Sequence, residues 1–263
     1  MRQTVSTWHE FGRRWDGVTN FLMAGECAAP FDFPMPPLAD LVDIVRNDDQ
    51  ARVNPGAKGE RVDLSDIRET FRKLPIEQAL RYEFRMSHFQ ARKWDAPGGF
   101  LHGFGRRVLE PLQDALRAQG FTWDPDGFGY YFFFSGPHCA TNYHMDKSNV
   151  LAWQLHGTKV FAGLNDPDRW EPLEQRVTSS VPTCRRPAGI EDADVLAYEM
   201  RPGSVLWNCL LTPHWVEAVS EPACSLNFSW FGLRRHGKLC RHEEELLAWQ
   251  ARQQQVTPSA ATP

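Results

Sequence analysis

Apolar side chains recur at helical spacing in the first 120 residues of the chain. One series, placed behind Asp63 as an N-cap, consists of Leu64, Ile67, Phe71 and Leu74. A second series, which Gly120 would end, consists of Leu101, Phe104, Val108, Leu112 and Ala115. A shorter one consists of Trp8, Phe11 and Trp15. Because residues three or four positions apart share one face of an α-helix, the pattern predicts helices, with loops at residues 30–37 and 54–60.

The pattern changes near residue 127. The run FGYYFFF at residues 128–134 is too aromatic and too short for a solvated helix, so it predicts a buried strand. Further short strands are expected at residues 150–155, 159–164, 195–200, 205–209, 215–219 and 224–231. Many short strands at this spacing favour an antiparallel sandwich or barrel, and a last helix is expected at about residues 239–253.

Composition narrows the class of protein. Of the 263 residues, 42% are hydrophobic and 24% are charged, which suits a large folded domain with an extension. The net charge of −4 and the lack of a long Lys/Arg run argue against nucleic acid as the main partner. Six cysteines without a CxxC pair indicate reduced, structural thiols. We find neither the apolar part of a signal peptide nor 18 consecutive apolar residues, so we expect a cytoplasmic protein without a membrane partner.

The sequence His144-Met145-Asp146 is the first candidate for chemistry. On a strand, residues i and i+2 point to the same face, so the imidazole and the carboxylate can converge on one metal ion. A second imidazole from a neighbouring strand would complete the set, and His214 is the candidate because it begins a strand after a Pro-Gly turn. Two histidines and one carboxylate with open positions are typical of non-heme Fe(II) oxygenases.

An H-x-D sequence is weak evidence alone, because nine histidines would produce one by accident in roughly one chain in two or three. A second match, His242-Glu243-Glu244, lies in a segment that is expected to be helical. On a helix, residues i and i+2 diverge by about 200°, so these side chains cannot chelate one ion. Secondary structure therefore separates the two cases.

The residues around His144 strengthen its case. The segment TNYHMDKSNVLAWQLHGTK at residues 141–159 resembles the JmjC/cupin-like 2-oxoglutarate oxygenases, especially the branch of the asparaginyl hydroxylase that modifies a hypoxia factor. The matching positions, counted from the first metal ligand, are Thr141, Gln154, Gly157 and Lys159. Later in the chain, the family has a Pro-Gly-Asp turn, an apolar strand and then a histidine, which appear here as PGSVLW at residues 202–207 followed by His214. Asn227-Phe228 stands where the family has an Asn close to the co-substrate. The resemblance covers roughly residues 125–232.

The resemblance implies roles for individual residues. It makes His144, Asp146 and His214 the ligands of Fe(II) and the catalytic residues. The residues that it places at the 2-oxoglutarate co-substrate are Lys159 and Thr141 at the distal carboxylate, Asn227 near the co-substrate or a metal-bound oxygen, and Tyr131 and Phe133 facing the pocket. Phe132 and Phe134 would then lie on the other side of their strand.

Two positions depart from the family pattern. The usual Asp after Pro-Gly is Ser204, which affects the turn and not the expected chemistry. The Asn that follows the metal pair is Asn149, one place earlier than in the hydroxylase, and Val150 stands at the family position. Asn149 is therefore expected to miss the substrate pocket. The first 120 residues resemble no family that we can name, which leaves the substrate open.

The resemblance implies a mainly β protein with helical extensions around a double-stranded β-helix (jelly roll, cupin-like) core. The expected division is a mostly helical region at residues 1–122 that packs on the core, the catalytic core at 123–236, a C-terminal helix at 237–254 and a disordered tail at 255–263. The sequence favours neither a monomer nor a homodimer formed through the C-terminal helix.

The activity that the resemblance implies is hydroxylation of a C–H bond with 2-oxoglutarate and O2, giving succinate and CO2. The substrate is a small molecule, an amino acid, or a peptide or protein side chain, with a slight preference for a small molecule or peptide; demethylation ranks lower. Two alternatives stay open. One is a cupin metalloenzyme that does not use 2-oxoglutarate, such as an isomerase, and the other is a non-catalytic ligand-binding cupin.

Overall fold

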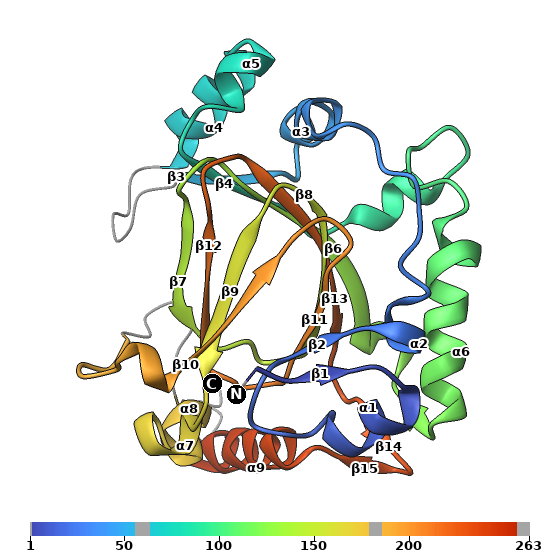
Figure 1. Cartoon of the computed structure of the whole chain (residues 1–263), viewed down its shortest axis with the longest axis vertical. Coiled ribbons are helices and arrows are strands. Elements are labelled where there is room, and N and C mark those ends of the chain that lie inside the picture. The colour runs from blue at the N-terminus through green and yellow to red at the C-terminus, as the bar shows by residue number, and fades with distance from the viewer. Residues whose placement is uncertain (1, 56–63, 179–185, 257–263) are drawn as a thin grey trace, which may run out of the picture.

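Eight consecutive strands build the centre of the molecule (Figure 1). The computed structural model describes residues 2–55, 64–178 and 186–256. The eight strands are β6 (Phe128–Ser135), β7 (Ala140–His144), β8 (Asn149–His156), β9 (Lys159–Leu164), β10 (Val195–Met200), β11 (Val205–Asn208), β12 (His214–Ala218) and β13 (Ala223–Trp230). Every strand expected from the sequence after residue 127 is present.

The order of these strands defines a jelly roll. One sheet contains the run β11-β8-β13-β6 and the other has the order β10-β9-β12-β7, and the pairs along both are antiparallel. Among these eight strands, those that follow one another in the chain therefore lie in opposite sheets, except for β9 and β10, which are neighbours in the smaller sheet. The predicted double-stranded β-helix core is confirmed, and so is the mainly β character with helical extensions.

The N-terminal region extends the larger sheet at both edges. Its helices are α1 (Trp8–Arg14), α2 (Gly25–Ala28), α3 (Leu38–Arg46), α4 (Leu64–Lys73), α5 (Ile76–Ala79) and α6 (Glu110–Ala118), the last preceded by a π-helical turn, η2 (Gly105–Leu109). Its strands are β1 (Thr4–Val5), β2 (Phe21–Met23), β3 (Arg52–Pro55), β4 (Phe84–His88) and β5 (Phe121–Thr122). The full sheet order is β1-β2-β11-β8-β13-β6-β4-β3.

The loop expected at residues 54–60 is therefore wrong at its start. Asn54 and Pro55 belong to β3, which pairs with β4, and residues 56–63, including the expected N-cap Asp63, lie outside the described residues. A four-residue strand is too short for its alternation to be recognised in the sequence, and its position is decided by pairing with β4, which lies about 30 residues further along the chain.

Aromatic side chains join the N-terminal region to the outer face of the larger sheet. Phe11 of α1 meets Trp207 of β11 edge-on, with ring centroids 4.9 Å apart. The indole N–H of Trp207 donates to the carbonyl oxygen of Trp15 at 3.1 Å. On the same face, Phe104 lies parallel to Phe228 of β13. The N-terminal helices therefore share one continuous core with the barrel.

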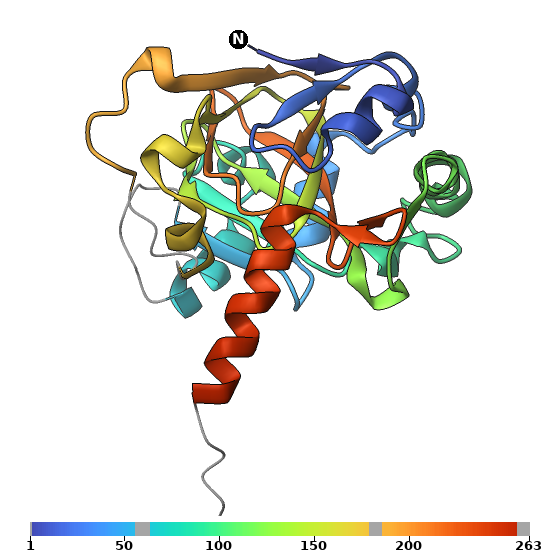
Figure 2. The same ribbon diagram turned by 90° about the horizontal axis from the view of Figure 1, so that it is seen from below.

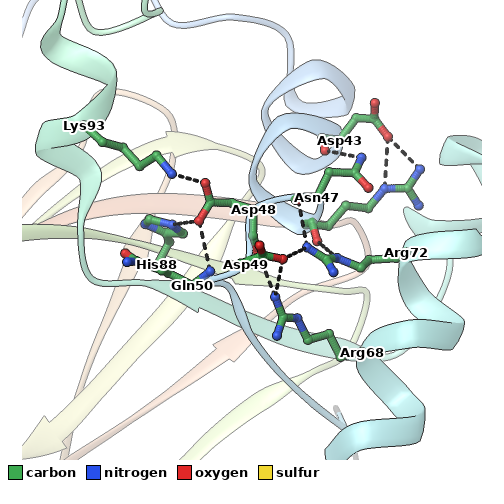
Figure 3. A network of polar contacts seen from close by, with 10 residues as sticks. Asp43, Asn47, Asp48, Asp49, Gln50, Arg68, Arg72, His88 and Lys93 are labelled. Carbon is green, nitrogen blue, oxygen red and sulfur yellow. Dashed lines mark hydrogen bonds and ion pairs between the residues drawn. The ribbon is translucent and has the colours of Figure 1, made fainter.

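A polar network ties the end of α3 to β4 (Figure 3). The Asp48 carboxylate accepts a hydrogen bond from the fully buried ring of His88 at 3.0 Å and also pairs with Lys93. Burial raises the pKa of Asp48, but hydrogen bonds from Lys93, His88 and the Gln50 N–H outweigh burial and hold that pKa below its usual range. The chain after β4 is thereby fixed where it leads to Phe89.

Between β9 and β10 the chain forms two short helices, α7 (Pro167–Trp170) and α8 (Leu173–Thr178). After β13 come β14 (Arg234–Arg235), β15 (Lys238–Leu239) and the long helix α9 (Arg241–Val256). Short 3-10 turns are η1 (Ala91–Asp95), η3 (Pro125–Gly127) and η4 (Asp192–Asp194). The outer turns of α9 extend away from the rest of the molecule (Figure 2).

The expected helix at the C-terminus is present with shifted ends. Its start is Arg241, because Lys238 and Leu239 pair with β14 instead. Residues 255 and 256 continue the helix, and 257–263, the rest of the expected tail, lie outside the described residues. The described cysteines are free and buried. Within the described residues, no helix combines the length and apolar character needed to cross a bilayer.

Candidate metal centre

Two imidazole rings face each other across neighbouring strands. His144 is the last residue of β7 and His214 is the first of β12, and the two residues are paired in the register of these strands. Their ring centroids lie 4.1 Å apart. Strand pairing thus brings together two histidines that are 70 residues apart in the sequence.

Asp146 adds a carboxylate, although not in the way the sequence predicts. β7 ends at His144, so Asp146 lies in the turn before β8 and not on a strand. Its two oxygens lie 3.9 Å from His144 Nε2 and 3.6 Å from His214 Nε2. The three ligand atoms are within 4.8 Å of one another, and no other such group of three occurs in the described parts of the chain.

Backbone carbonyl groups set which nitrogen carries the hydrogen in the neutral form of each ring. His144 Nδ1 lies 2.7 Å from the carbonyl oxygen of Asn142, and His214 Nδ1 lies 2.9 Å from that of Thr212. A carbonyl oxygen can only accept, so each Nδ1 carries the hydrogen. Each Nε2 therefore keeps its lone pair, which points toward Asp146, and such a second hydrogen bond is typical of histidines that bind metals.

His214 is the more buried of the two rings. Burial and nearby His144 lower its pKa to about 4, while Asp146 and the hydrogen bond to Thr212 act in the opposite direction. The ring is therefore neutral at neutral pH, which is the form that binds a cation. Phe161 of β9 stacks on it with parallel planes and ring centroids 4.9 Å apart, which limits its rotation.

The turn before His214 is held by side chains from three other elements. The N–H of Leu211 donates to the carbonyl oxygen of Asp146 at 2.8 Å, and the carbonyl oxygen of Leu211 accepts from buried Arg176 at 3.0 Å. The neighbouring Leu210 accepts from His242 through its carbonyl oxygen and donates to the side chain of Asn149. This turn thus connects the segments that carry Asp146 and His214.

Leu211 has φ +57°, in the left-handed region that residues with a Cβ rarely adopt. The surrounding hydrogen bonds hold it there. His242, part of the second H-x-carboxylate match, lies on α9 as expected and takes part in this turn instead of a metal cluster.

His144, Asp146 and His214, which we call the metal cluster, line a cavity of about 710 Å³ between the two sheets. Five other candidate residues from the sequence line it too: Thr141, Lys159, Asn227, Tyr131 and Phe133. Val150 also lines it, whereas Asn149 points to Leu210, so Asn149 misses the cavity as expected. Ser204 accepts a hydrogen bond from the N–H of Arg201 within its turn, again as expected.

Lys159 is a buried cation. The residue is only 4% exposed to solvent, and its Nζ donates to the carbonyl oxygen of Phe133 at 3.2 Å and to Ser225 Oγ at 3.4 Å. No ion pair joins it to an acid in the described part of the chain. Burial lowers its pKa to about 8, while Cys224 acts in the opposite direction. A buried ammonium group without a carboxylate is costly, so the site favours an anionic ligand.

Asn227 and Tyr131 face each other on β13 and β6. A hydrogen bond from the Asn227 side chain reaches the Tyr131 hydroxyl, whose pKa is raised by burial and by Asp146. The amide oxygen of Asn227 is buried and has no hydrogen-bond partner among the described residues. A buried acceptor of this kind fits a ligand that donates a hydrogen bond in the cavity.

Several lining residues were not found from the sequence. Gln154 was noted only as a match to the family pattern, while Asn54, Arg85 and Phe89 come from the N-terminal region. Their strands β3 and β4 were not predicted, so no pattern placed them near the metal cluster. Phe89 lies beside Tyr131, with ring centroids 5.1 Å apart, and is 46% exposed at the rim.

No family model and no curated protein sequence matches the chain. Solved structures match it, among them YcfD, a ribosomal oxygenase from Escherichia coli, at 15% identity and a TM-score of 0.52, covering 100% of this chain and 61% of that one. YcfD in complex with cobalt and 2-oxoglutarate matches at 15% identity and a TM-score of 0.51, covering 100% and 62%.

YcfD in complex with cobalt and succinic acid matches at 16% identity and a TM-score of 0.52, covering 100% of this chain and 61% of that one. The chain thus spans less than two thirds of the length of these proteins. At this identity the likeness shows the fold. The chain is a jelly-roll protein of the cupin-like class, with a His-Asp-His cluster in the cavity between its sheets.

Proposed function

We propose that the protein is an Fe(II)- and 2-oxoglutarate-dependent dioxygenase that hydroxylates a C–H bond. One observation carries the proposal: the same cavity holds two imidazoles with a carboxylate, and also a buried lysine without an acidic partner in the described residues. The cluster fits a divalent cation with open coordination positions. The lysine fits the far carboxylate of a dicarboxylate that is bound at that cation.

The reaction balances with the two co-substrates that the proposal names. The substrate C–H bond, O2 and 2-oxoglutarate become a C–OH group, succinate and CO2. One oxygen atom enters the new hydroxyl group and the other enters succinate. Of the four electrons that reduce O2, two come from decarboxylation of 2-oxoglutarate and two come from the C–H bond. When bound, the iron would supply the oxidising chemistry.

The chain's own residues position and protect the reactants. His144, Asp146 and His214 would hold the iron, and Lys159 with Thr141 would neutralise and hydrogen-bond the distal carboxylate of 2-oxoglutarate. Tyr131 and Phe133 narrow the cavity and exclude water, while the free amide oxygen of Asn227 accepts a hydrogen bond from a bound group.

Two further observations support the proposal. The similar YcfD structures contain cobalt with 2-oxoglutarate or with succinic acid. These two organic acids are the co-substrate and the co-product that the proposal assigns to this chain. The resemblance of residues 141–159 to the asparaginyl hydroxylase branch favours a peptide or protein side chain as the substrate. The cavity of about 710 Å³ is also large enough for a small molecule or an amino acid.

The test is anaerobic addition of Fe(II) and 2-oxoglutarate to the purified protein. We expect a weak visible charge-transfer band, because the keto acid chelates the iron. His144→Ala should abolish the band, and Lys159→Ala should raise the 2-oxoglutarate concentration needed for half-saturation by about tenfold or more. Exposed His9 gives a matched control, His9→Ala, with an unchanged band.

Different outcomes point to the alternatives. A metalloenzyme without 2-oxoglutarate would bind metal but show no band, and Lys159→Ala would leave its activity intact. A protein that binds neither Fe(II) nor 2-oxoglutarate would contradict the proposal as a whole.

A further inference from the structure

A second cavity of about 430 Å³ meets the first one at the metal cluster. Three residues line both cavities: Phe89, Tyr131 and Asp146. Asp146 is one of the three clustered ligands, so a metal held there would be reached from both sides. Phe89 and Tyr131 form the wall between them, with their rings 5.1 Å apart.

Small residues make room for this second cavity. Gly129 of β6 and Ser229 of β13 are paired opposite each other, and both line it. A Cβ atom added to Gly129 would meet only Ser229 Oγ, at 3.9 Å, within ordinary contact distance. Along the same face of β6 the next residues are Tyr131 and Phe133, which fill the space between the sheets. The glycine thus leaves open a volume that a side chain could occupy.

The lining has aromatic groups at the rim and little charge. Phe231 is 51% exposed, and Phe89, at the junction with the first cavity, is 46% exposed. Two charged residues lie among the described lining: Asp146, which belongs to the metal cluster, and Lys147. The Lys147 ammonium group lies over the Trp249 ring at 5.8 Å. Among the described lining residues no further acid is present to pair with a cationic group, and Lys147 would repel one.

We propose that this second cavity, the substrate arm, seats the part of the substrate next to the reacting carbon, and that this part is uncharged and apolar. The inference rests on the proposed function, in which 2-oxoglutarate occupies the first cavity between the metal cluster and Lys159. The substrate then approaches Asp146 from the other side of Phe89 and Tyr131. An ammonium or guanidinium group would lose its hydration here without gaining a counter-ion, so cationic substrates are excluded from the arm.

The test fills the arm without touching the first cavity. Gly129 is not a ligand of the co-substrate in our proposal, and Gly129→Ala adds one methyl group in an open space. Gly129→Val adds more volume and keeps a residue that favours strands. Phe231→Ala removes the outer aromatic ring, and Tyr82→Ala is the matched control, since Tyr82 is a similarly exposed aromatic residue that lines neither cavity.

The probes are 2-phenylethanol and 2-phenylethylammonium, which share a ring and differ in charge. Binding is measured by saturation-transfer NMR, which needs no metal, and the affinities for Co(II) and 2-oxoglutarate are measured by calorimetry. We expect the alcohol to bind at least about tenfold more tightly than the ammonium ion. Gly129→Val should weaken binding of the alcohol by at least about tenfold, with smaller losses in Gly129→Ala and Phe231→Ala and none in Tyr82→Ala.

Two results would overturn the substrate arm while the proposed function stands. One is Gly129→Val binding the alcohol like the wild type, and the other is equal binding of the two probes, in each case with Co(II) and 2-oxoglutarate bound normally. A wild type that binds neither Co(II) nor 2-oxoglutarate would instead overturn the proposed function, and the assignment of the arm to a substrate with it.

Discussion

Each of the two clustered histidines is oriented by the carbonyl group two residues before it in the chain. Asn142 serves His144 and Thr212 serves His214. The contact is local, so it forms together with the strand end and needs no distant partner. It fixes which nitrogen is free, and the other tautomer would place a hydrogen on the nitrogen nearest Asp146. Residue by residue, the site is thus prepared for a cation before any ligand arrives.

At Lys159, burial leads to a prediction about pH. Its pKa in the ligand-free protein is lowered to about 8. An anion binds the charged form, so binding raises this pKa, and affinity must fall as pH rises above 8. We expect the dissociation constant of 2-oxoglutarate to increase by about tenfold per pH unit above that value. Calorimetry from pH 7 to 9.5 measures it.

The control is Lys159→Arg, whose guanidinium group keeps its charge over this range. This variant should bind more weakly at pH 7 but lose the steep dependence above pH 8. A wild-type curve that stays flat to pH 9.5 would contradict the assignment of Lys159 to the distal carboxylate.

At the scale of elements, the turn between β11 and β12 sets the geometry of the metal cluster. Arg176 is fully buried and donates to the carbonyl oxygen of Leu211, whose N–H in turn holds Asp146. We predict that Arg176→Met raises the dissociation constant of Co(II) by about 10- to 100-fold. The visible spectrum of the bound Co(II) should also change, which a loss of stability alone would not cause.

Exposed Arg169 provides the matched control. Arg169→Met removes a surface pair with Asp194 and should leave both the Co(II) affinity and the spectrum unchanged. If Arg176→Met is folded by circular dichroism and binds Co(II) like the wild type, then Arg176 does not position the cluster.

The network around Asp48 supports a prediction about stability. Asp48→Ala leaves buried His88 without its acceptor, so we expect a loss of about 1–3 kcal/mol in the free energy of unfolding at pH 7. Because the folded state depresses the pKa of Asp48 below its ordinary 3.8, the contribution is complete above about pH 4 and is lost as pH falls further.

Denaturant unfolding at several pH values measures this difference. The gap between wild type and Asp48→Ala should narrow below pH 4. Asp114→Ala is the control, because its pair with Arg117 is on the surface and should contribute no more than about 1 kcal/mol. If Asp48→Ala and Asp114→Ala lower the free energy of unfolding equally, the buried network around Asp48 stabilises the protein no more than a surface ion pair does.

The elements that the sequence predicts are those whose signal is local. The aromatic run at 128–134 and the following short apolar runs gave the barrel strands, and helical spacing gave α1, α4 and α6. The short strands β2, β3 and β4 are defined by pairing with distant strands, so nothing in their own few residues marks them. The candidates His144, Asp146 and His214 follow from the H-x-D spacing and the expected strands, and Lys159 follows from the family resemblance, whereas Phe89, Arg85 and the second cavity have no such signal.

At the scale of the whole molecule, the barrel depends on the chain before it. Strands β2 and β4 cover the two edges of the larger sheet, and α1 buries the outer face of Trp207. We predict that residues 123–236 alone do not fold, because open sheet edges and a bare aromatic face favour aggregation. Circular dichroism of this fragment should show no cooperative unfolding, and size exclusion should show soluble aggregates, whereas the full chain should unfold cooperatively and elute without aggregates.

The pairing of His144 with His214 makes the metal cluster a product of sheet assembly. An unfolded chain holds these rings far apart, so a divalent cation that occupies the cluster binds only the completed barrel. By mass action, the bound ion stabilises the folded state: at a free concentration 100 times its dissociation constant, the ion adds about 2.7 kcal/mol to the free energy of unfolding. Cells short of that ion would carry a larger fraction of this protein in the protease-sensitive, open form, so metal supply would govern its abundance.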